Sequence, residues 1–219
     1  MRRVLPILFN TEMVRANLDG RKSCTRRLVK GFVPDDAIWG YTAFTPKGYI
    51  SCRGTFADGY GEKFFKLPYQ PGDILYVRET VWQKTGHYLD VDGETKAVWC
   101  NEFKYVATDE KPETGWNYSW VKRPSIHMPK EAARIWLKVT DVRVERLQEI
   151  TPDVIKNEGI ILDPKECVGK FDYTSELYFL FQRLWNSTIK KPDFDRYGWD
   201  ANPWVWVIEF ERCEKPNVN

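Results

Sequence analysis

Short runs of alternating hydrophobic and polar residues dominate the chain, and such runs predict β-strands. The predicted strands lie at residues 4–9, 24–29, 70–82, 134–147 and 202–213. Residues 35–67 alternate aromatic and polar positions between glycines, which is typical of a hairpin or an irregular β insertion. Residues 83–120 are polar and aromatic without a clear period, so we expect a long loop region there.

Two short helices are predicted by the residues at their ends. In residues 10–20, Thr11 is the expected N-cap and Gly20 the expected terminator. In residues 151–159, Thr151 is the expected cap, a proline occupies the first turn and a glycine ends the pattern. Both segments are therefore expected to form single short helices between strands.

A longer helix is predicted over residues 174–189, where apolar residues recur at helical spacing. These residues are Leu177, Leu180, Phe181, Leu184 and Trp185. Because strands outnumber helices, the sequence predicts an α+β fold, with a small mixed β-barrel as the natural architecture. A chain of 219 residues can bury a sizeable core and predicts a single domain over 1–219.

The charge of the chain is unevenly distributed. Residues 1–30 carry eight Lys and Arg against two acidic residues, a local charge of +6. The rest of the chain carries 25 basic and 29 acidic residues, a charge of −4. Such asymmetry suggests an anionic partner for the N-terminal segment.

The five cysteines and two histidines stand far apart in the sequence. Because zinc sites use closely spaced pairs of these residues, we expect no metal and no cofactor. An odd number of cysteines without close pairs indicates a reduced, cytoplasmic protein. The apolar run near the N-terminus is too short for a signal peptide or a membrane span, so no membrane partner is expected.

The strand predicted around residues 74–82 carries two charges among apolar residues. Alternation places Arg78 and Glu79 on opposite faces, and both faces are otherwise largely apolar. At least one of these charges should therefore be partly buried and needs a partner. A structural ion pair explains the arrangement, and the alternative is that Glu79 faces a binding pocket.

Glu158 breaks a local rule, because it stands where a carboxylate meets the negative end of its helix dipole. Such violations occur at functional sites, although an exposed glutamate without a role is the alternative. His127 lies between two prolines, in a segment expected to be rigid and extended, and is either structural or a general base. Trp199 precedes the last strand and is either a platform for base stacking or a lid on the core.

Residues 18–31 concentrate basic side chains around a cysteine and a threonine. In an extended strand Thr25 and Arg27 share one face, while Arg26 lies on the other. Lys22 lies at the turn before this strand and near other cations, which is one way to make a lysine a base at neutral pH. A solvated basic face and a grip on phosphate are alternative explanations of the same segment.

The order of these motifs resembles the ASCH family of the PUA-like superfamily, and in detail the larger ASCH-type proteins of phages and prophages. The motifs are "GRKSCTRR", "PGDILYVRET", a long strand, a helix ending in "KNEG" and a closing "PWVWVIEF" strand. They frame the whole chain, with residues 31–69 and 83–125 as β-rich insertions. The resemblance implies a PUA-like mixed β-barrel with flanking short helices beside a cleft, and RNA or nucleobases as ligands.

Some small bacterial ASCH proteins are amidohydrolases that remove an acyl group from the exocyclic amine of cytidine. Their lysine and threonine lie in a G-x-K-x-x-T-x-R motif, which gives Lys22 and Thr25 here, with Arg27 as the trailing arginine. Their glutamate matches Glu158. The resemblance implies that Thr25 is the nucleophile, Lys22 its base, and Glu158 a proton donor or orienting group.

We therefore expect a protein that binds a nucleoside or RNA, with hydrolysis of amide-modified pyrimidine nucleosides as the leading function. The residues expected to contact the substrate are Lys22, Thr25, Arg26, Arg27, Arg78, Glu79, His127, Glu158 and Trp199. One alternative is a non-catalytic reader of RNA or modified bases, whose affinity would fall steeply with salt. Another is a phage accessory protein that acts through protein contacts. The sequence leaves the oligomeric state open.

Overall fold

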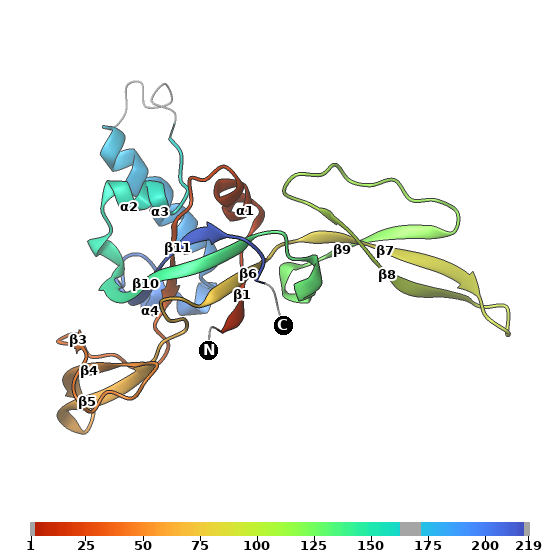
Figure 1. Cartoon of the computed structure of the whole chain (residues 1–219). Coiled ribbons are helices and arrows are strands. Elements are labelled where there is room, and N and C mark those ends of the chain that lie inside the picture. Colours follow the sequence, from red (N-terminus) through yellow and green to blue (C-terminus); the bar gives the residue numbers. More distant parts are fainter. Residues whose placement is uncertain (1–2, 163–171, 217–219) are drawn as a thin grey trace. The chain divides into compact units, whose positions relative to one another are not determined.

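The computed structural model describes residues 3–162 and 172–216. Within these residues the fold is α+β, as predicted, and its strands form several sheets without a closed barrel (Figure 1). The chain divides into two compact units. Unit 1 comprises Met1–Gly20, Ile74–Leu137 and Arg212–Asn219, and unit 2 comprises Arg21–Asp73 and Lys138–Glu211. The single domain expected over the whole chain stays a prediction.

Unit 1 contains two groups of paired strands and three short helices in its described part. Its elements are β1 (Val4–Leu8), α1 (Thr11–Leu18), β6 (Ile74–Arg78), β7 (Val81–Leu89), β8 (Thr95–Tyr105), β9 (Tyr118–Arg123) and the 3-10 helices η1 (Ser125–His127) and η2 (Lys130–Ala132). β1 runs parallel to β6, and β7 lies between β8 and β9 in an antiparallel sheet (Figure 1). Most of this second sheet falls within the insertion expected at 83–125.

Three local predictions in unit 1 are wrong. The strand predicted over 70–82 is interrupted, because β6 and β7 belong to different groups of strands and two residues separate them. The loop predicted over 83–120 contains β8, most of β7 and half of β9. Both faces of this sheet are largely accessible, so its strands lack the hydrophobic alternation of half-buried strands. The extended segment expected around His127 is the 3-10 helix η1.

The N-terminus of α1 is capped by Asn10, and the expectation that Thr11 caps it is wrong. Asn10 Oδ1 accepts a hydrogen bond from the Met13 N–H at 2.8 Å, which satisfies one of the amides that a helix start leaves without a partner. The expected terminator is confirmed. Gly20 has a φ of 74°, in the left-handed region that favours glycine.

We expect Asn10→Ala to lower the free energy of unfolding by about 0.5–2 kcal/mol, because the Met13 amide loses its acceptor. Thr11→Ala is the matched control, since it removes a neighbouring side chain that makes no capping bond in the described structure. Urea denaturation followed by circular dichroism measures both variants. Equal losses in the two variants would contradict the assignment of Asn10 as the cap.

Unit 2 contains two three-stranded groups and the remaining helices. Its elements are β2 (Cys24–Leu28), β3 (Ile38–Gly40), β4 (Tyr49–Phe56), β5 (Gly59–Lys66), most of β10 (Trp136–Arg146), η3 (Leu147–Glu149), α2 (Pro152–Asn157), α3 (Tyr173–Thr188), η5 (Lys191–Asp193), α4 (Phe194–Tyr197) and most of β11 (Trp204–Cys213). β11 lies between β10 and β2, antiparallel to β2. β3, β4 and β5 form an antiparallel sheet within the insertion expected at 31–69.

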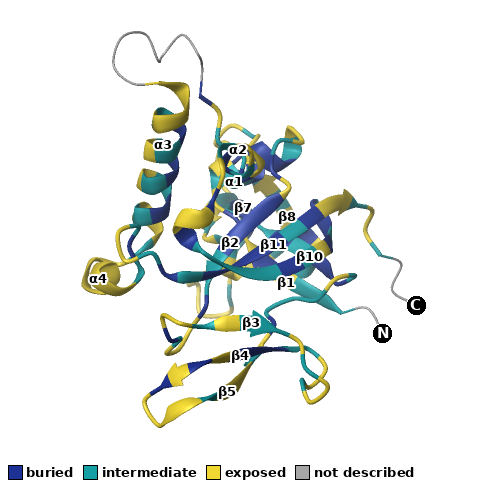
Figure 2. Ribbon diagram, turned by 90° about the vertical axis from the view of Figure 1, so that its left-hand side faces the viewer, coloured by how far each residue is buried: buried dark blue, intermediate teal, exposed yellow. Residues whose placement is uncertain are grey.

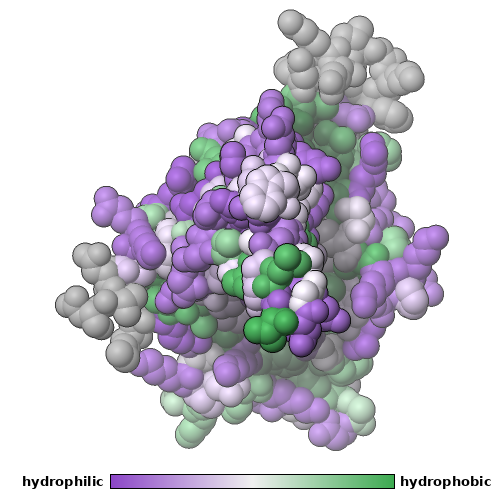
Figure 3. Space-filling model, turned by 90° about the vertical axis from the view of Figure 1, so that its right-hand side faces the viewer, coloured by the Kyte–Doolittle hydropathy of each residue, from purple (hydrophilic) through white to green (hydrophobic). Residues whose placement is uncertain are grey.

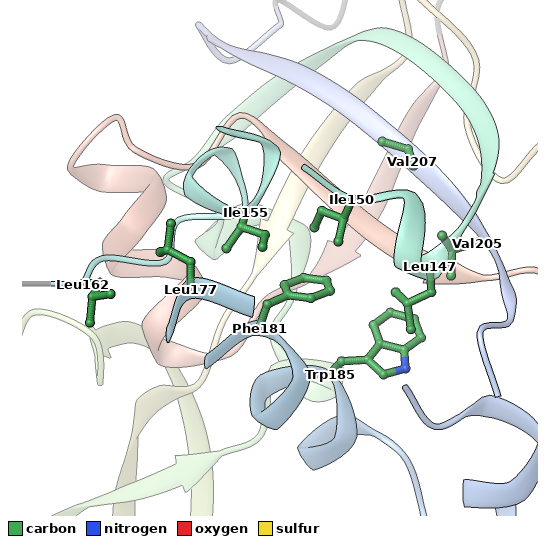
Figure 4. Close-up of a cluster of buried hydrophobic side chains, with 9 residues drawn as sticks. All are labelled: Leu147, Ile150, Ile155, Leu162, Leu177, Phe181, Trp185, Val205 and Val207. Atoms are coloured by element: carbon green, nitrogen blue, oxygen red, sulfur yellow. The ribbon is translucent and has the colours of Figure 1, made fainter. Parts of the chain in front are cut away.

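The amphipathic helix predicted over 174–189 is confirmed as α3. It buries Leu177, Phe181 and Trp185 and exposes its other side, as the burial colours show (Figure 2). The buried side packs on α2 and β11 (Figure 4). The buried members of this cluster are Leu147, Ile150, Ile155, Leu162, Leu177, Phe181, Trp185, Val205 and Val207. This core holds α2 in place, and α2 leads directly into Glu158.

Candidate functional site

The end of α2 brings Glu158 beside the start of β2. Glu158 follows the helix as its C-cap, and the fully buried Ile155 anchors the helix in the core. Lys22 and Glu158 form an isolated antiparallel β-bridge, and the Ser23 N–H donates to Asn157 O at 2.9 Å. The backbone itself therefore aligns two residues that the sequence separates by 136 positions.

Lys22 and Glu158 form a buried ion pair. Lys22 Nζ lies 2.7 Å from Glu158 Oε2, and the two side chains are 0% and 5% exposed. Lys22 Nζ also donates to the backbone carbonyls of Cys24 at 2.8 Å and of Glu158 at 2.9 Å. Because an ammonium group has three N–H donors, these acceptors match a protonated Lys22. Lys22 is therefore not part of a solvated basic face, and Glu158 is not an exposed glutamate.

Arg26 is the second cation of this site. Its Nη1 donates to Glu158 Oε1 at 3.2 Å and its Nη2 to Glu145 Oε2 at 3.3 Å, while the side chain is only 1% exposed. Arg26 Nε has no hydrogen-bond partner among the described residues. The two cations around Glu158 explain how its carboxylate is tolerated at the unfavourable end of the α2 dipole.

The charges continue from Arg26 along β10 as an alternating row. Glu145 Oε1 accepts from Arg143 Nε at 2.5 Å, and Arg143 Nη1 donates to Glu209 Oε1 at 2.6 Å and to Asp141 Oδ2 at 3.0 Å. Burial alone would lower the pKa of Arg143, but its hydrogen bonds to these carboxylates raise the pKa above its ordinary value. The row gives each of these partly exposed charges an opposite neighbour, and it holds the buried Arg26, which contacts the Glu158 carboxylate.

Cys24 lies beside the ion pair but is not a nucleophile at neutral pH. Burial, and after it the charge of Glu158, raise the pKa of the Cys24 thiol to about 12, against the lowering effects of Lys22 and Arg26. The thiol therefore stays protonated and unreactive. The hydroxyl of Thr25 is then the better candidate for a nucleophile on this strand.

Thr25 has a buried hydroxyl without a partner. It stands opposite Ile208 of β11, on the other face of β2 from Arg26, and is 0% exposed. Within residues 3–162 and 172–216, Thr25 Oγ accepts and donates no hydrogen bond. Burying a polar group without a partner costs about 1–3 kcal/mol. An unfavourable arrangement of this kind is expected where a side chain is kept for function.

Arg27 shares the face of Thr25 and is half-buried. Burial lowers the pKa of Arg27, whereas the charges of Glu158 and Tyr69 raise it. Glu158 thus acts on Arg27 as well as on Cys24, although these two residues point to opposite faces of β2. The antiparallel bridge between Lys22 and Glu158 places the backbone of Glu158 beside the chain just before β2.

Arg78 and Glu79 belong to unit 1, where both have structural partners. Arg134 donates to the two carboxylate oxygens of Glu79 at 2.8 and 2.9 Å, and the Glu79 side chain is 2% exposed. Arg78 Nε donates to Met128 O at 2.7 Å, and its Nη2 donates to Ile126 O. These contacts are those of the structural ion pair, the first of the two interpretations of Glu79.

The two weaker candidates lie in different units. Trp199 of unit 2 is partly buried against the core, with its ring centroid 5.9 Å from that of Phe181, and its backbone N–H donates to Asn186 Oδ1 at 2.9 Å. This environment favours the interpretation that Trp199 covers the hydrophobic core over the alternative that it stacks on a base. His127 of unit 1 is exposed on η1.

The sequence alone did not identify Glu145 as a partner of Arg26, or Arg134 as the partner of Glu79. Glu145 lies 119 positions from Arg26, and Arg134 lies 55 positions from Glu79. A buried charge signals that a partner exists, but only strand pairing identifies it. The charged run at 143–146 inside a predicted strand was the available signal for Glu145.

In the described part of the chain no group of three or more His, Cys, Asp or Glu is placed to hold a metal ion. Among the described helices, none is both long and apolar enough to cross a membrane. Neither models of protein families, nor curated proteins, nor solved structures match this chain. The likeness to ASCH proteins therefore rests on the motifs in the sequence and stays a proposal.

Proposed function

We propose that the chain is an ASCH-type protein with a PUA-like fold that hydrolyses the amide of pyrimidine nucleosides acylated on the exocyclic amine. The observation that carries this proposal is the buried Thr25 hydroxyl, which has no hydrogen-bond partner among the described residues, on a strand that starts beside the Lys22–Glu158 pair. A nucleophile, a base and a proton donor are the parts that acyl transfer requires. The proposal places the nucleoside at the edge of β2, with Arg27 as a substrate contact.

In the first half of the proposed reaction, the Lys22–Glu158 pair moves two protons. Transfer of one proton within the pair gives a Lys22 amine and a Glu158 carboxylic acid. Thr25 Oγ attacks the acyl carbon, and its proton passes to Lys22. As the C–N bond breaks, Glu158 protonates the leaving nitrogen. The result is a Thr25 ester, a free amino nucleoside and a Lys22 ammonium beside a Glu158 carboxylate.

Water completes the proposed reaction. It adds to the carbonyl carbon of the Thr25 ester and gives one proton to Glu158. The ester bond breaks as Lys22 returns a proton to Thr25 Oγ, and the carboxylic acid leaves. The pair is then back in its amine and carboxylic acid form, and the net change is one amide plus water to one amine plus one acid. Arg26 acts as a positioning residue, because it holds Glu158 Oε1.

We expect Thr25→Val to abolish turnover without lowering stability. Valine keeps the branched shape, and the hydroxyl that it removes has no hydrogen bond to lose in the described structure. Thr25→Ser keeps the nucleophile and is expected to retain turnover. Each purified variant is incubated with cytidine acylated on its exocyclic amine and with a small panel of other amide-modified nucleosides. Chromatography then measures the released nucleoside, and urea denaturation measures stability.

Lys22→Ala and Glu158→Gln complete this test. Each is expected to slow turnover at least about 100-fold, because general acid–base groups contribute about 10²–10⁴-fold. Release of cytidine by Thr25→Val at the wild-type rate would overturn the proposal. Failure of the wild type on every nucleoside of the panel would overturn it as well, and would leave a non-catalytic reader of RNA or modified bases as the function to test.

A further inference from the structure

The sheet of β8, β7 and β9 in unit 1 carries aromatic and lysine side chains together on one face. Its register places Trp82 opposite both Lys104 and Lys122, and Lys84 opposite Trp120. Residues that stand directly opposite each other in antiparallel strands share a face of the sheet. The members of this aromatic–lysine face are Trp82, Lys84, Tyr88, Lys96, Glu102, Lys104, Tyr118, Trp120 and Lys122.

The lysines of the aromatic–lysine face lie over its rings. Lys122 Nζ is 5.7 Å from the ring centroid of Trp82, and Lys84 Nζ is 5.1 Å from that of Tyr118. Lys84 also pairs with Glu102 at 2.9 Å, and Lys96 pairs with Asp90. Trp82 and Tyr118 therefore each have a cation beside the ring, which brings positive charge and a flat apolar surface within reach of one ligand.

The aromatic–lysine face is open to solvent. Tyr88 is 50% exposed, Lys104 and Lys122 are exposed, and Trp82, Tyr118 and Trp120 are partly exposed. Figure 3 looks at the molecule from the side toward which β7 and β8 extend in Figure 1, along these strands rather than onto the face, and shows hydrophobic side chains among hydrophilic ones. Rings that stay partly in water are costly, so four of them on one small sheet mark an interaction surface.

The charge of this face indicates the kind of partner. Four lysines stand against two carboxylates, because Lys84 pairs with Glu102 and Lys96 with Asp90, so the face keeps a net positive charge and the partner is expected to be anionic. Lysine is depleted at the centres of protein–protein interfaces, which disfavours a protein partner. Unpaired bases stack on exposed aromatic rings while lysines neutralise the phosphates between them. In a duplex the bases are stacked on one another and cannot reach the rings.

We propose that the aromatic–lysine face binds single-stranded nucleic acid, with bases stacked on its tryptophan and tyrosine rings and phosphates held by its lysines. This site lies wholly in unit 1 and does not depend on hydrolysis at Thr25 in unit 2. The two proposals therefore fail separately, because one is measured as binding of an oligonucleotide and the other as release of a nucleoside.

The first test removes the rings. Fluorescence anisotropy of labelled oligouridine, with oligothymidine and a duplex of equal length as further arms, measures the affinity of the full chain. Loss of one stacked base costs about 1–3 kcal/mol, so Trp120→Leu and Tyr118→Leu are each expected to weaken binding about 5- to 150-fold. The two single strands are expected to bind and the duplex to bind more weakly, and the first two arms distinguish RNA from DNA.

The second test removes charge and does not depend on whether the tryptophan variant folds. For a single strand, the slope of log affinity against log salt is about −0.7 for each phosphate neutralised. The double variant Lys104→Gln with Lys122→Gln is therefore expected to reduce the magnitude of that slope by about 1.4. Arg123→Gln is the matched control, because Arg123 stands on β9 but on the opposite face, over Trp99.

Two results would overturn the proposal. One is absence of binding by the wild type to either single strand at low salt. The other is an unchanged affinity and salt slope in the aromatic and lysine variants, with circular dichroism showing that they are folded. Equal changes in Arg123→Gln and in the lysine double variant would also contradict it, since the effect would then be one of net charge rather than of this face.

Discussion

Phe181→Ala is expected to lower the free energy of unfolding by about 3–5 kcal/mol, because it leaves a cavity in the centre of the unit 2 core. The Phe181 side chain is 3% exposed on the inner side of α3 and contacts the ring of Trp199. It also lies below the Arg26 guanidinium, 6.0 Å from the ring centroid. The loss should therefore reach beyond the hydrophobic cluster and loosen the arginine that holds Glu158.

Phe179→Ala is the matched control for this experiment. Phe179 has the same side chain on the same helix, but it is 50% exposed on the outer side. Urea denaturation followed by tryptophan fluorescence compares the two variants, and we expect a small change in midpoint for Phe179→Ala and a large one for Phe181→Ala. Similar changes in both would mean that α3 does not pack on the core as described.

The spacing of apolar residues was sufficient to predict the elements that line this core. Leu177, Phe181 and Trp185 recur every four residues and are buried as the helical pattern requires. β10 and β11 lie within the runs predicted at 134–147 and 202–213. In these segments one side of each element faces the core. Apolar residues therefore recur along the sequence at the period of the helix or strand.

The same reasoning failed where the pattern does not report burial. The strands of the sheet around β7 expose much of both faces, so their rings and lysines show no apolar period. Their stability comes from cross-strand pairs such as Trp82 with Lys122, and a pairing register cannot be derived from one strand alone. The hydrophobic pattern therefore predicted a long loop over residues 83–120, where the structure has a sheet.

The candidate site was partly predictable for a different reason. Glu158 stood out because it breaks the dipole rule at the end of α2, and Lys22 and Arg26 supply the positive charge that compensates for this position. The sequence could identify a carboxylate that needs a nearby positive charge. It could not identify the β-bridge that places Lys22 beside that carboxylate. The burial of the Thr25 hydroxyl could not be predicted either, because most threonines in folded proteins are exposed at the surface.

The second large effect is expected when the buried ion pair is broken. Glu158→Leu leaves Lys22 and Arg26 as buried cations without their shared carboxylate, which is expected to cost about 3–5 kcal/mol of unfolding free energy. Adding Lys22→Met to this variant removes one of the two buried cations that have lost the Glu158 carboxylate. The double variant should therefore be more stable than the sum of the two single losses predicts, with a coupling energy of about 0.5–3 kcal/mol from urea denaturation.

The exposed pair of Lys156 with Asp153 at 3.2 Å is the control for this cycle, and no measurable coupling is expected there. Additive losses for Lys22→Met and Glu158→Leu would show that the two side chains do not act as a pair. The cycle also separates structure from chemistry, because the apolar double variant restores stability without restoring proton transfer. If that variant is folded and still releases cytidine at the wild-type rate, the pair only holds α2 against β2 and hydrolysis occurs elsewhere. If it is folded and inactive, the buried charges are kept for the reaction, since stability alone does not require them.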